Sequence, residues 1–123
     1  MPAGLLAPHT SPDDNLLSRL SRAGVRVTLQ EAGDRLLAGQ DWARSGVVER
    51  REPDARAPAA LGPGEEDWQG PVESGPGSLW HPAAAWVRPA ALVRAWLSGP
   101  GIGWRGGVRG ASLAPRGGAG PAL

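Results

Sequence analysis

The sequence predicts a mixed α/β (α+β) structure with few strands and an incomplete core. Two stretches carry apolar residues at helical spacing, one after Ser11-Pro12 and one after Pro89, and short apolar runs between them have strand character. The 19 glycines and 13 prolines make up 32 of the 123 residues. Phe and Tyr are absent, so the six tryptophans are the only aromatic residues. This composition is typical of low-complexity chains, and a self-sufficient core is not expected.

The first expected element is a helical stretch that ends by Gly39. Ser11-Pro12-Asp13-Asp14 has the composition of a helix start, with a capping serine, a proline that fits the first turn, and two carboxylates that the helix dipole favours. Gly24 either divides the stretch into two helices or bends a single one. The expected apolar stripe is irregular and consists of Leu16, Leu17, Leu20, Val27, Leu29, Ala32, Leu36 and Leu37.

One face of this helix is predicted to be basic. Arg19, Arg22 and Arg26 follow one another at spacings of three and four residues, which places them on the same side. A solvated helix face is the favoured interpretation. Contact with RNA phosphates is the alternative.

The middle of the chain is expected to hold a short strand and a long loop. Asp41-Trp42 begins a turn, and Gly46-Val47-Val48-Glu49 is predicted to be a strand. Residues 52–77 are rich in Pro, Gly, Ala and acidic residues without periodicity, so they form a loop or an insertion. The acidic triplet Glu65-Glu66-Asp67 resembles part of a metal site, but no other ordered ligands stand nearby and a solvated loop is favoured.

Residues 78–113 are predicted to contain strands around a second helix. An apolar run ends at Trp86-Val87, and Pro89 fits the first position of the helix that follows. This helix spans roughly 9 residues before Ser98-Gly99-Pro100, too few for stability in water, so it must pack on another element. Two short strands are expected at residues 102–104 and 108–113, and a flexible tail at residues 114–123. The apolar positions of the helix are Leu92, Val93, Trp96 and Leu97.

A glycine pattern near the end of the chain is interpreted as coincidence. Gly101-Ile102-Gly103-Trp104-Arg105-Gly106 matches the dinucleotide-binding pattern G-x-G-x-x-G. The pattern follows a helix instead of a strand, however, and Gly107-Val108-Arg109-Gly110 after it does not begin a helix. We therefore do not expect a pyrophosphate site there.

The residue inventory excludes several kinds of chemistry. With no cysteine, the chain has no disulfide, thiolate metal site or cysteine nucleophile, and we expect no metal. The formal charge of +1 gives no general argument for a nucleic-acid partner. No apolar stretch approaches the ~20 residues that cross a bilayer, and no secretory signal is present, so a cytoplasmic location without a membrane is expected. For His81, packing or a backbone hydrogen bond is favoured over catalysis, and for His9 a merely local role is favoured.

Three blocks of sequence resemble a known flavoprotein family in their order and spacing. The first block is residues 8–26. The second consists of Gly39-Gln40-Asp41-Trp42 together with Ser45-Gly46-Val47-Val48-Glu49. The third is residues 79–95, which include Leu79-Trp80-His81-Pro82-Ala83. Over roughly residues 4 to 113 the chain is similar to the FAD-dependent oxidoreductase half of the bacterial bifunctional enzymes that build 5-methylaminomethyl-2-thiouridine at the tRNA wobble position. More widely, it resembles D-amino-acid-oxidase-like flavoproteins.

This resemblance implies a partial FAD-binding oxidoreductase fold with an incomplete sheet. Residues 1–51 would be substrate-domain helices and a short strand, and residues 52–77 a Pro/Gly/acidic loop. Residues 78–113 would be the strand-helix-strand crossover toward the FAD domain, followed by the flexible tail at 114–123.

The activity that the resemblance implies is an oxidation on tRNA. In the family, the FAD half removes the carboxymethyl group from 5-carboxymethylaminomethyl-2-thiouridine, and a methyltransferase half then methylates the amine with S-adenosylmethionine. The flavin accepts the hydride while the protein supplies positioning and electrostatics. Neither the dinucleotide fingerprint nor the methyltransferase half is present here, so the 123-residue chain is expected neither to hold FAD nor to turn over alone.

Few site residues carry over from the family, and no catalytic base does. Val108 corresponds to a position whose backbone lies against the adenine of FAD, with strand burial as the alternative. Trp86, Arg88 and His81 are candidates for the substrate side, with a core Trp and a solvent-facing Arg as the alternative. Two other functions remain open: a non-catalytic basic-helix RNA-binding module, and an unstable truncated product without activity.

Overall fold

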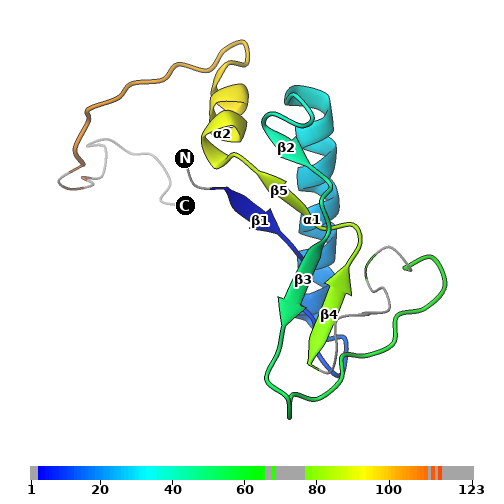
Figure 1. Cartoon of the computed structure of the whole chain (residues 1–123). Coiled ribbons are helices and arrows are strands. Elements are labelled where there is room, and N and C mark those ends of the chain that lie inside the picture. Colours follow the sequence, from blue (N-terminus) through cyan, green and yellow to red (C-terminus); the bar gives the residue numbers. More distant parts are fainter. Residues whose placement is uncertain (1–2, 66–67, 69–76, 111, 113, 115–123) are drawn as a thin grey trace.

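The computed structural model describes residues 3–65, 68, 77–110, 112 and 114 (Figure 1). A long helix, α1, lies along one side of a small antiparallel sheet, and a short helix, α2, follows the last strand. In chain order the elements are β1 (Gly4–Leu6), α1 (Leu16–Arg35), β2 (Trp42–Ala43), β3 (Val47–Arg50), β4 (Ser78–His81), β5 (Ala85–Val87) and α2 (Pro89–Leu97). The mixed fold class expected from the sequence is therefore present.

The strands form two separate antiparallel sheets. In the three-stranded sheet β5 is central, between β1 and β2, and Leu5 and Ala43 both lie opposite Trp86. In the two-stranded sheet β3 pairs with β4. The Arg51 N–H donates to the Gly77 carbonyl over 2.6 Å, which closes the base of the long segment between these two strands. Strand β1 had no local signal in the sequence, because it is three residues long.

Helix α1 starts later than predicted and is not interrupted. Its N-cap is Asn15 and not Ser11. The Asn15 Oδ1 accepts a hydrogen bond from the Ser18 N–H over 3.0 Å. The chain turns just before the helix at Asp14, whose φ is 45°, so residues 11–14 cannot be helical. The Ser11 hydroxyl instead accepts from the Asn15 N–H over 3.0 Å. Gly24 lies inside one continuous helix that ends at Arg35, before Gly39.

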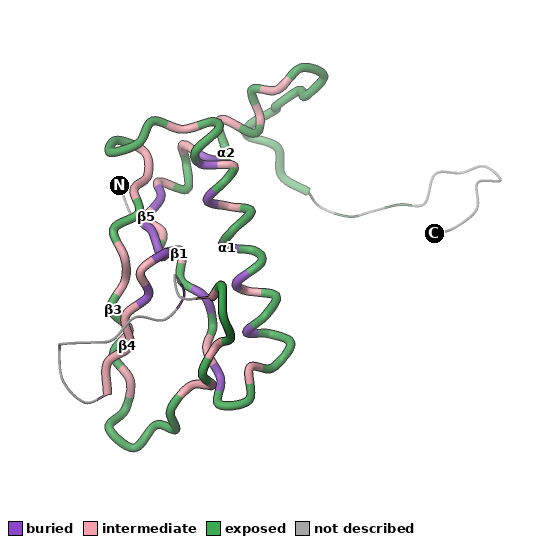
Figure 2. The backbone as a smooth tube through the Cα atoms, turned by 90° about the vertical axis from the view of Figure 1, so that its right-hand side faces the viewer, coloured by how far each residue is buried: buried purple, intermediate pink, exposed green. Residues whose placement is uncertain are grey.

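The buried face of α1 is not the predicted leucine stripe. The buried residues recur every three or four positions, which defines one helix face, and Figure 2 shows this face turned toward the strands. They are Ser18, Arg22, Val25, Leu29 and Ala32. Leu29 and Ala32 of the predicted stripe are among them, but Leu16, Leu17, Leu20 and Val27 are about 60% exposed, so the apolar pattern was right for part of the helix and wrong at these four positions.

The core is small and includes a residue from the long segment between β3 and β4. Trp68 is 4% exposed and packs with Val25 and Leu29 of α1 and with Ala83 and Ala85 near β5. Leu6, Trp42 and Leu61 pack around this cluster. The segment predicted to be a loop or insertion therefore contributes the largest side chain of the core.

The second helix agrees with its prediction, but the strands expected after it are absent from the described residues. α2 has Pro89 at its first position, buries Leu92, and approaches α1 through a 3.0 Å hydrogen bond from Trp96 Nε1 to Glu31 Oε2. Residues 101–110 are exposed, belong to no helix or strand, and lead away from the body (Figure 1). Five of these ten residues are glycines, which disfavour strands, and no strand edge lies beside them. Residues 111, 113 and 115–123 lie outside the described part.

Candidate functional site

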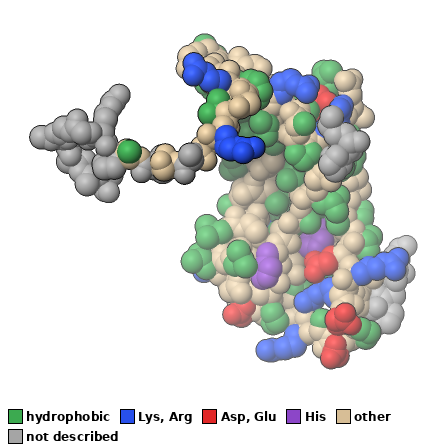
Figure 3. Space-filling model, turned by 90° about the vertical axis from the view of Figure 1, so that its left-hand side faces the viewer, with side chains coloured by type: hydrophobic (Ala, Val, Ile, Leu, Met, Phe, Trp, Pro, Cys, Tyr) green, Lys and Arg blue, Asp and Glu red, His purple; other side chains and the backbone are tan. Residues whose placement is uncertain are grey.

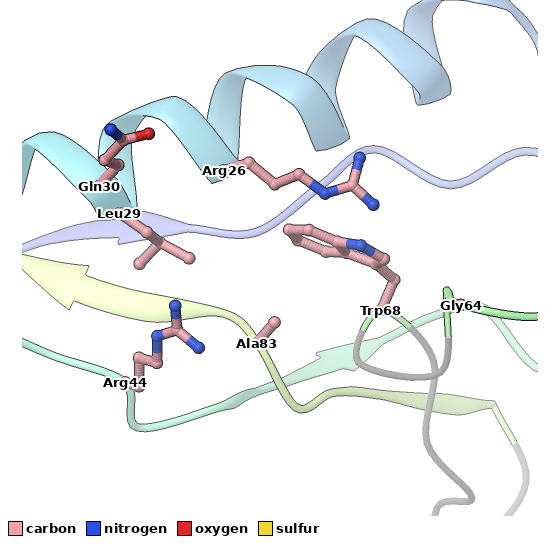
Figure 4. Close-up of a pocket in the computed structure, with 7 residues that line it drawn as sticks. All are labelled: Arg26, Leu29, Gln30, Arg44, Gly64, Trp68 and Ala83. Atoms are coloured by element: carbon pink, nitrogen blue, oxygen red, sulfur yellow. The ribbon is translucent and has the colours of Figure 1, made fainter.

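A pocket of about 440 Å³ opens between α1, the residues after β2, and the segment that carries Trp68 (Figure 4). Its floor is apolar, because Leu29, Trp68 and Ala83 are all less than 9% exposed. The remaining lining residues are Arg26, Gln30, Arg44 and Gly64. A concave site with an apolar floor and a few polar groups at its rim is the usual form of a ligand pocket.

Arg26 is held firmly at one side of this pocket. Its Nη2 donates to Glu65 Oε2 over 2.7 Å, and its Cζ lies 4.9 Å from the centre of the Trp68 ring. Figure 4 shows the guanidinium extending from α1 over the indole. This cation–π contact and the ion pair together fix the orientation of the guanidinium, while 49% of its side chain stays exposed.

Arg44 reaches toward the same space from the opposite side (Figure 4). It follows β2 and is exposed, and within the described residues no acceptor or acidic partner is found for it. The neighbouring charges of Arg22 and Arg26 are balanced by Asp14 and Glu65. Arg44 therefore leaves an uncompensated positive charge at the pocket.

The predicted basic helix face does not exist as a free surface. Arg22 is buried and donates from Nη1 and Nη2 to the two Asp14 oxygens over 2.6 and 2.9 Å, and its Nε lies 3.6 Å from Glu65. With Arg26 also paired, Arg19 is the one of the three that is exposed and has no ion pair within the described region. On the face in Figure 3, acidic and basic side chains also intermingle over the lower part. Both sequence interpretations, a solvated face and an RNA-phosphate face, are wrong for Arg22.

The Asp14–Arg22 pair makes the free energy of unfolding depend on pH in the acidic range. Hydrogen bonding from Arg22 holds the pKa of the Asp14 carboxyl below its ordinary value of 3.8. A carboxyl with a lowered folded pKa adds stability that is complete above the unfolded pKa and is lost as the pH falls through the folded one. We expect the Asp14→Asn variant to have a lower free energy of unfolding near neutral pH. We also expect that free energy to fall less between pH 6 and pH 3 than in the unsubstituted chain, as measured by urea melts at several pH values.

Asp13→Asn is the matched control for this experiment. Asp13 is the exposed neighbour of Asp14, so its substitution makes the same charge change without removing the contact to Arg22. We expect it to keep the acid dependence of the unsubstituted chain. Equal acid dependence in the Asp14→Asn variant would contradict a stabilising ion pair.

The two histidines lie apart and have local partners. His81, on β4, is fully buried, and its Nε2 lies 2.8 Å from Glu49 Oε2 on β3. Its Nδ1 is buried without a hydrogen-bond partner among the described residues. His9 is exposed, and its Nδ1 lies 3.0 Å from Ser18 Oγ. The expected packing of His81 is therefore present, but its hydrogen bond goes to a side chain of the neighbouring strand and not to the backbone, whereas His9 makes local contacts as expected.

Trp86 and Arg88, the other substrate-side candidates, lie around β5 in different surroundings from His81. Trp86 is half-buried and lies on the sheet face opposite Ala85, beside Leu5 and Ala43. Arg88 precedes α2, and its Nη1 is 3.5 Å from Asp41 Oδ1. The structure does not gather His81, Trp86 and Arg88 into one pocket: among the described pockets only Arg88 lines one, at the end of α1.

The described residues do not fit a flavin site by themselves. Gly101–Gly106 follows α2 and is exposed, with no strand before it and no helix after it among the described residues, so it lacks the strand-turn-helix that cradles a pyrophosphate. Val108 is 69% exposed and belongs to no strand, so the expected strand burial is wrong. Its backbone contact to an adenine remains an untested expectation.

No group of three or more His, Asp or Glu side chains among the described residues is arranged to hold a metal ion. Glu65 of the acidic triplet pairs with Arg22 and Arg26, and Glu66 and Asp67 lie outside the described residues. No helix in this part of the chain is long and apolar enough to span a bilayer.

Sequence reasoning missed the residues that form the pocket. Trp68 and Gly64 lie in the segment without periodicity. Arg44 lies in a short connection after β2, and Gln30 is one of many polar residues on α1. One signal could have pointed to Trp68: it is the only aromatic residue between residues 52 and 77, and tryptophan is highly buried on average.

The chain is similar to a segment of several curated bacterial proteins. The tRNA 5-methylaminomethyl-2-thiouridine biosynthesis bifunctional protein MnmC of Polaromonas naphthalenivorans is 44% identical over all of this chain and over 22% of that protein. The proteins of the same name from Verminephrobacter eiseniae and from Polaromonas sp. strain JS666 are 47% and 50% identical over 92% and 83% of this chain. The chain spans about a fifth of the length of these relatives.

Other comparisons add no further relatives. No protein-family profile matches the chain. No solved structure matches it either.

Proposed function

Because this chain is homologous to a segment of the bifunctional tRNA 5-methylaminomethyl-2-thiouridine biosynthesis proteins, we propose that it works as a part of their FAD-dependent oxidoreductase half. In this proposal the complete protein removes the carboxymethyl group from 5-carboxymethylaminomethyl-2-thiouridine at the tRNA wobble position. The flavin supplies the oxidation when it is bound. The segment described here supplies scaffold and tRNA contacts.

One observation carries the proposal: the similarity covers 83–100% of this chain at 44–50% identity in three relatives that share one name. The body of α1 on the sheet, tied by the ion pair of the buried Arg22 with the half-buried Asp14, supports this role, since functional groups act best from rigid elements. The described residues contain no flavin cradle, so FAD would be held by other parts of the complete protein.

A segment exchange tests the proposal. The segment of the Polaromonas naphthalenivorans protein that aligns with this chain is replaced by these 123 residues, and the chimera is compared with a deletion of the same segment. We expect the chimera to copurify with FAD and to convert 5-carboxymethylaminomethyl-2-thiouridine in tRNA, followed by mass spectrometry of the released nucleosides. We expect the deletion to do neither.

A folded, FAD-loaded chimera that converts no substrate would contradict the proposal. So would full conversion by the deletion, because the segment would then be dispensable for the reaction. The unsubstituted relative is the positive control for both readouts.

A further inference from the structure

We propose that the pocket between Arg26 and Arg44 binds an unpaired nucleotide of an RNA, with Arg44 on its phosphate and Arg26 against its base. Nothing in the relatives' names assigns this pocket. The choice of an RNA as the source of the nucleotide rests on the proposed function; the choice of an anionic, partly flat ligand rests on the pocket itself.

The pocket has the charge that a phosphate requires. Among the described residues, those that line it include two arginines and a glutamine and no acidic side chain. Arg26 is paired with Glu65, whereas Arg44 has no acceptor among the described residues, so the free charge lies at Arg44. Because the Arg44 side chain is exposed, a phosphate can reach it without crossing the apolar floor. A guanidinium offers two parallel donors to a phosphate.

The pocket also has the shape and surface that a base requires. Its volume of about 440 Å³ lies within the range of small-molecule sites. The Trp68 ring is 4% exposed and is covered by Arg26, so it is not itself a free stacking surface. The Arg26 side chain is 49% exposed instead, and Trp68 and Glu65 hold its guanidinium in place. Bases of single-stranded RNA stack on guanidinium planes.

The position of the two arginines favours a single-stranded ligand. Arg26 and Arg44 reach the pocket from opposite sides, α1 and the connection after β2, so a nucleotide between them would present the face of its base to Arg26 and its phosphate to Arg44 (Figure 4). Bases stacked inside a duplex cannot enter such a pocket, whereas bases in loops can be turned outward. We therefore expect preference for unpaired RNA over duplex RNA.

Fluorescence anisotropy with the 123-residue chain tests this inference. The probes are a short fluorescein-labelled single-stranded RNA, the same sequence as a duplex, and a single strand with one abasic position, each titrated at several salt concentrations. For Arg44→Gln we expect a several-fold weaker affinity for the single strand, and a slope of log affinity against log salt that is smaller by about 1.

Arg50→Gln is the matched control for Arg44→Gln. Arg50, on β3, is also an exposed arginine but does not line the pocket, so the variant makes the same change in net charge. We expect its salt slope and affinity to stay near those of the unsubstituted chain. Circular dichroism spectra establish that each variant keeps its helices.

Arg26→Lys tests the stacking part separately. Lysine keeps the charge but not the guanidinium plane. We expect weaker binding of the intact single strand and little change with the strand that is abasic at the bound position.

Some outcomes overturn the inference. The first is equal binding by Arg44→Gln and Arg50→Gln, and the second is no binding of single-stranded RNA by the unsubstituted chain at low salt. Binding that follows Arg44 while the segment exchange fails would leave the pocket standing and remove the tRNA-modification proposal. If the chimera converts the substrate but Arg44→Gln does not weaken RNA binding, the tRNA-modification proposal stands and the pocket proposal is removed.

Discussion

Replacing Trp68 with alanine is expected to lower the free energy of unfolding by about 3–5 kcal/mol, the usual cost of removing a buried tryptophan. Trp68 is 4% exposed and contacts both α1 and the residues around β5, so its removal leaves a cavity in a core of few residues. A small domain has only about 5–15 kcal/mol in total. Urea unfolding followed by far-UV circular dichroism measures the loss.

Trp104→Ala is the control for this change. Trp104 is 71% exposed and lies in the extended residues after α2, so the same substitution should cost less than about 0.5 kcal/mol. If both tryptophan variants unfold at the same urea concentration as the unsubstituted chain, Trp68 does not anchor its segment to the core.

Gly46→Ala is expected to be the second most damaging substitution, at about 2–4 kcal/mol. Gly46 has φ of 67°, a left-handed conformation that costs roughly 1 kcal/mol or more for alanine. An added Cβ would also overlap the Trp80 ring at Cη2 and Cζ2, and such overpacking typically costs about 1–3 kcal/mol. Urea unfolding measures the sum, and intrinsic fluorescence reports movement of Trp80.

Gly39→Ala separates these two contributions. Gly39 has φ of 82°, but an added Cβ there would have no atom within 4 Å, so only the backbone cost of roughly 1 kcal/mol remains. A clear difference between the two variants is the signature of the ring contact at Gly46. Equal losses would show that Trp80 does not lie over Gly46.

Elements with strong local signals could be predicted from the sequence. Helix α2 starts at Pro89 and ends before Ser98-Gly99-Pro100, because a proline at the first position and a Gly-Pro stop act within a few residues. The strand over residues 46–49 was also expected, and β3 covers Val47–Arg50. Neither prediction required knowledge of distant parts of the chain.

The buried face of α1 could not be predicted, because it depends on distant partners. Ser18 and Arg22 are polar, and an apolar pattern places them outside. They are buried because Ser11 contacts Ser18 and because Asp14 and Glu65 neutralise Arg22. With that side of the helix satisfied, Leu16 and Leu20 are left on the opposite side, exposed.

The candidate pocket could not be predicted from the sequence either. Arg44, Gln30 and Trp68 come from three segments that meet only in the folded chain, and none belongs to a motif. The resemblance suggested Trp86 in β5, Arg88 just after β5 and His81 in β4, and none of these lines this pocket. Resemblance pointed to the relatives; it did not point to this site.

The position of β5 has a consequence for the order in which the chain folds. β5 is the last strand of the chain but the central one of its sheet, and Gly4 of β1 pairs with Val87. Closing so long a loop costs entropy before any contact rewards it, so this sheet forms late. During synthesis α1 can form early, whereas β1 and β2 stay without their partner strand β5 until residues 85–87 have been made. A ribosome that stalls before Ala85 therefore releases a chain that cannot close this sheet.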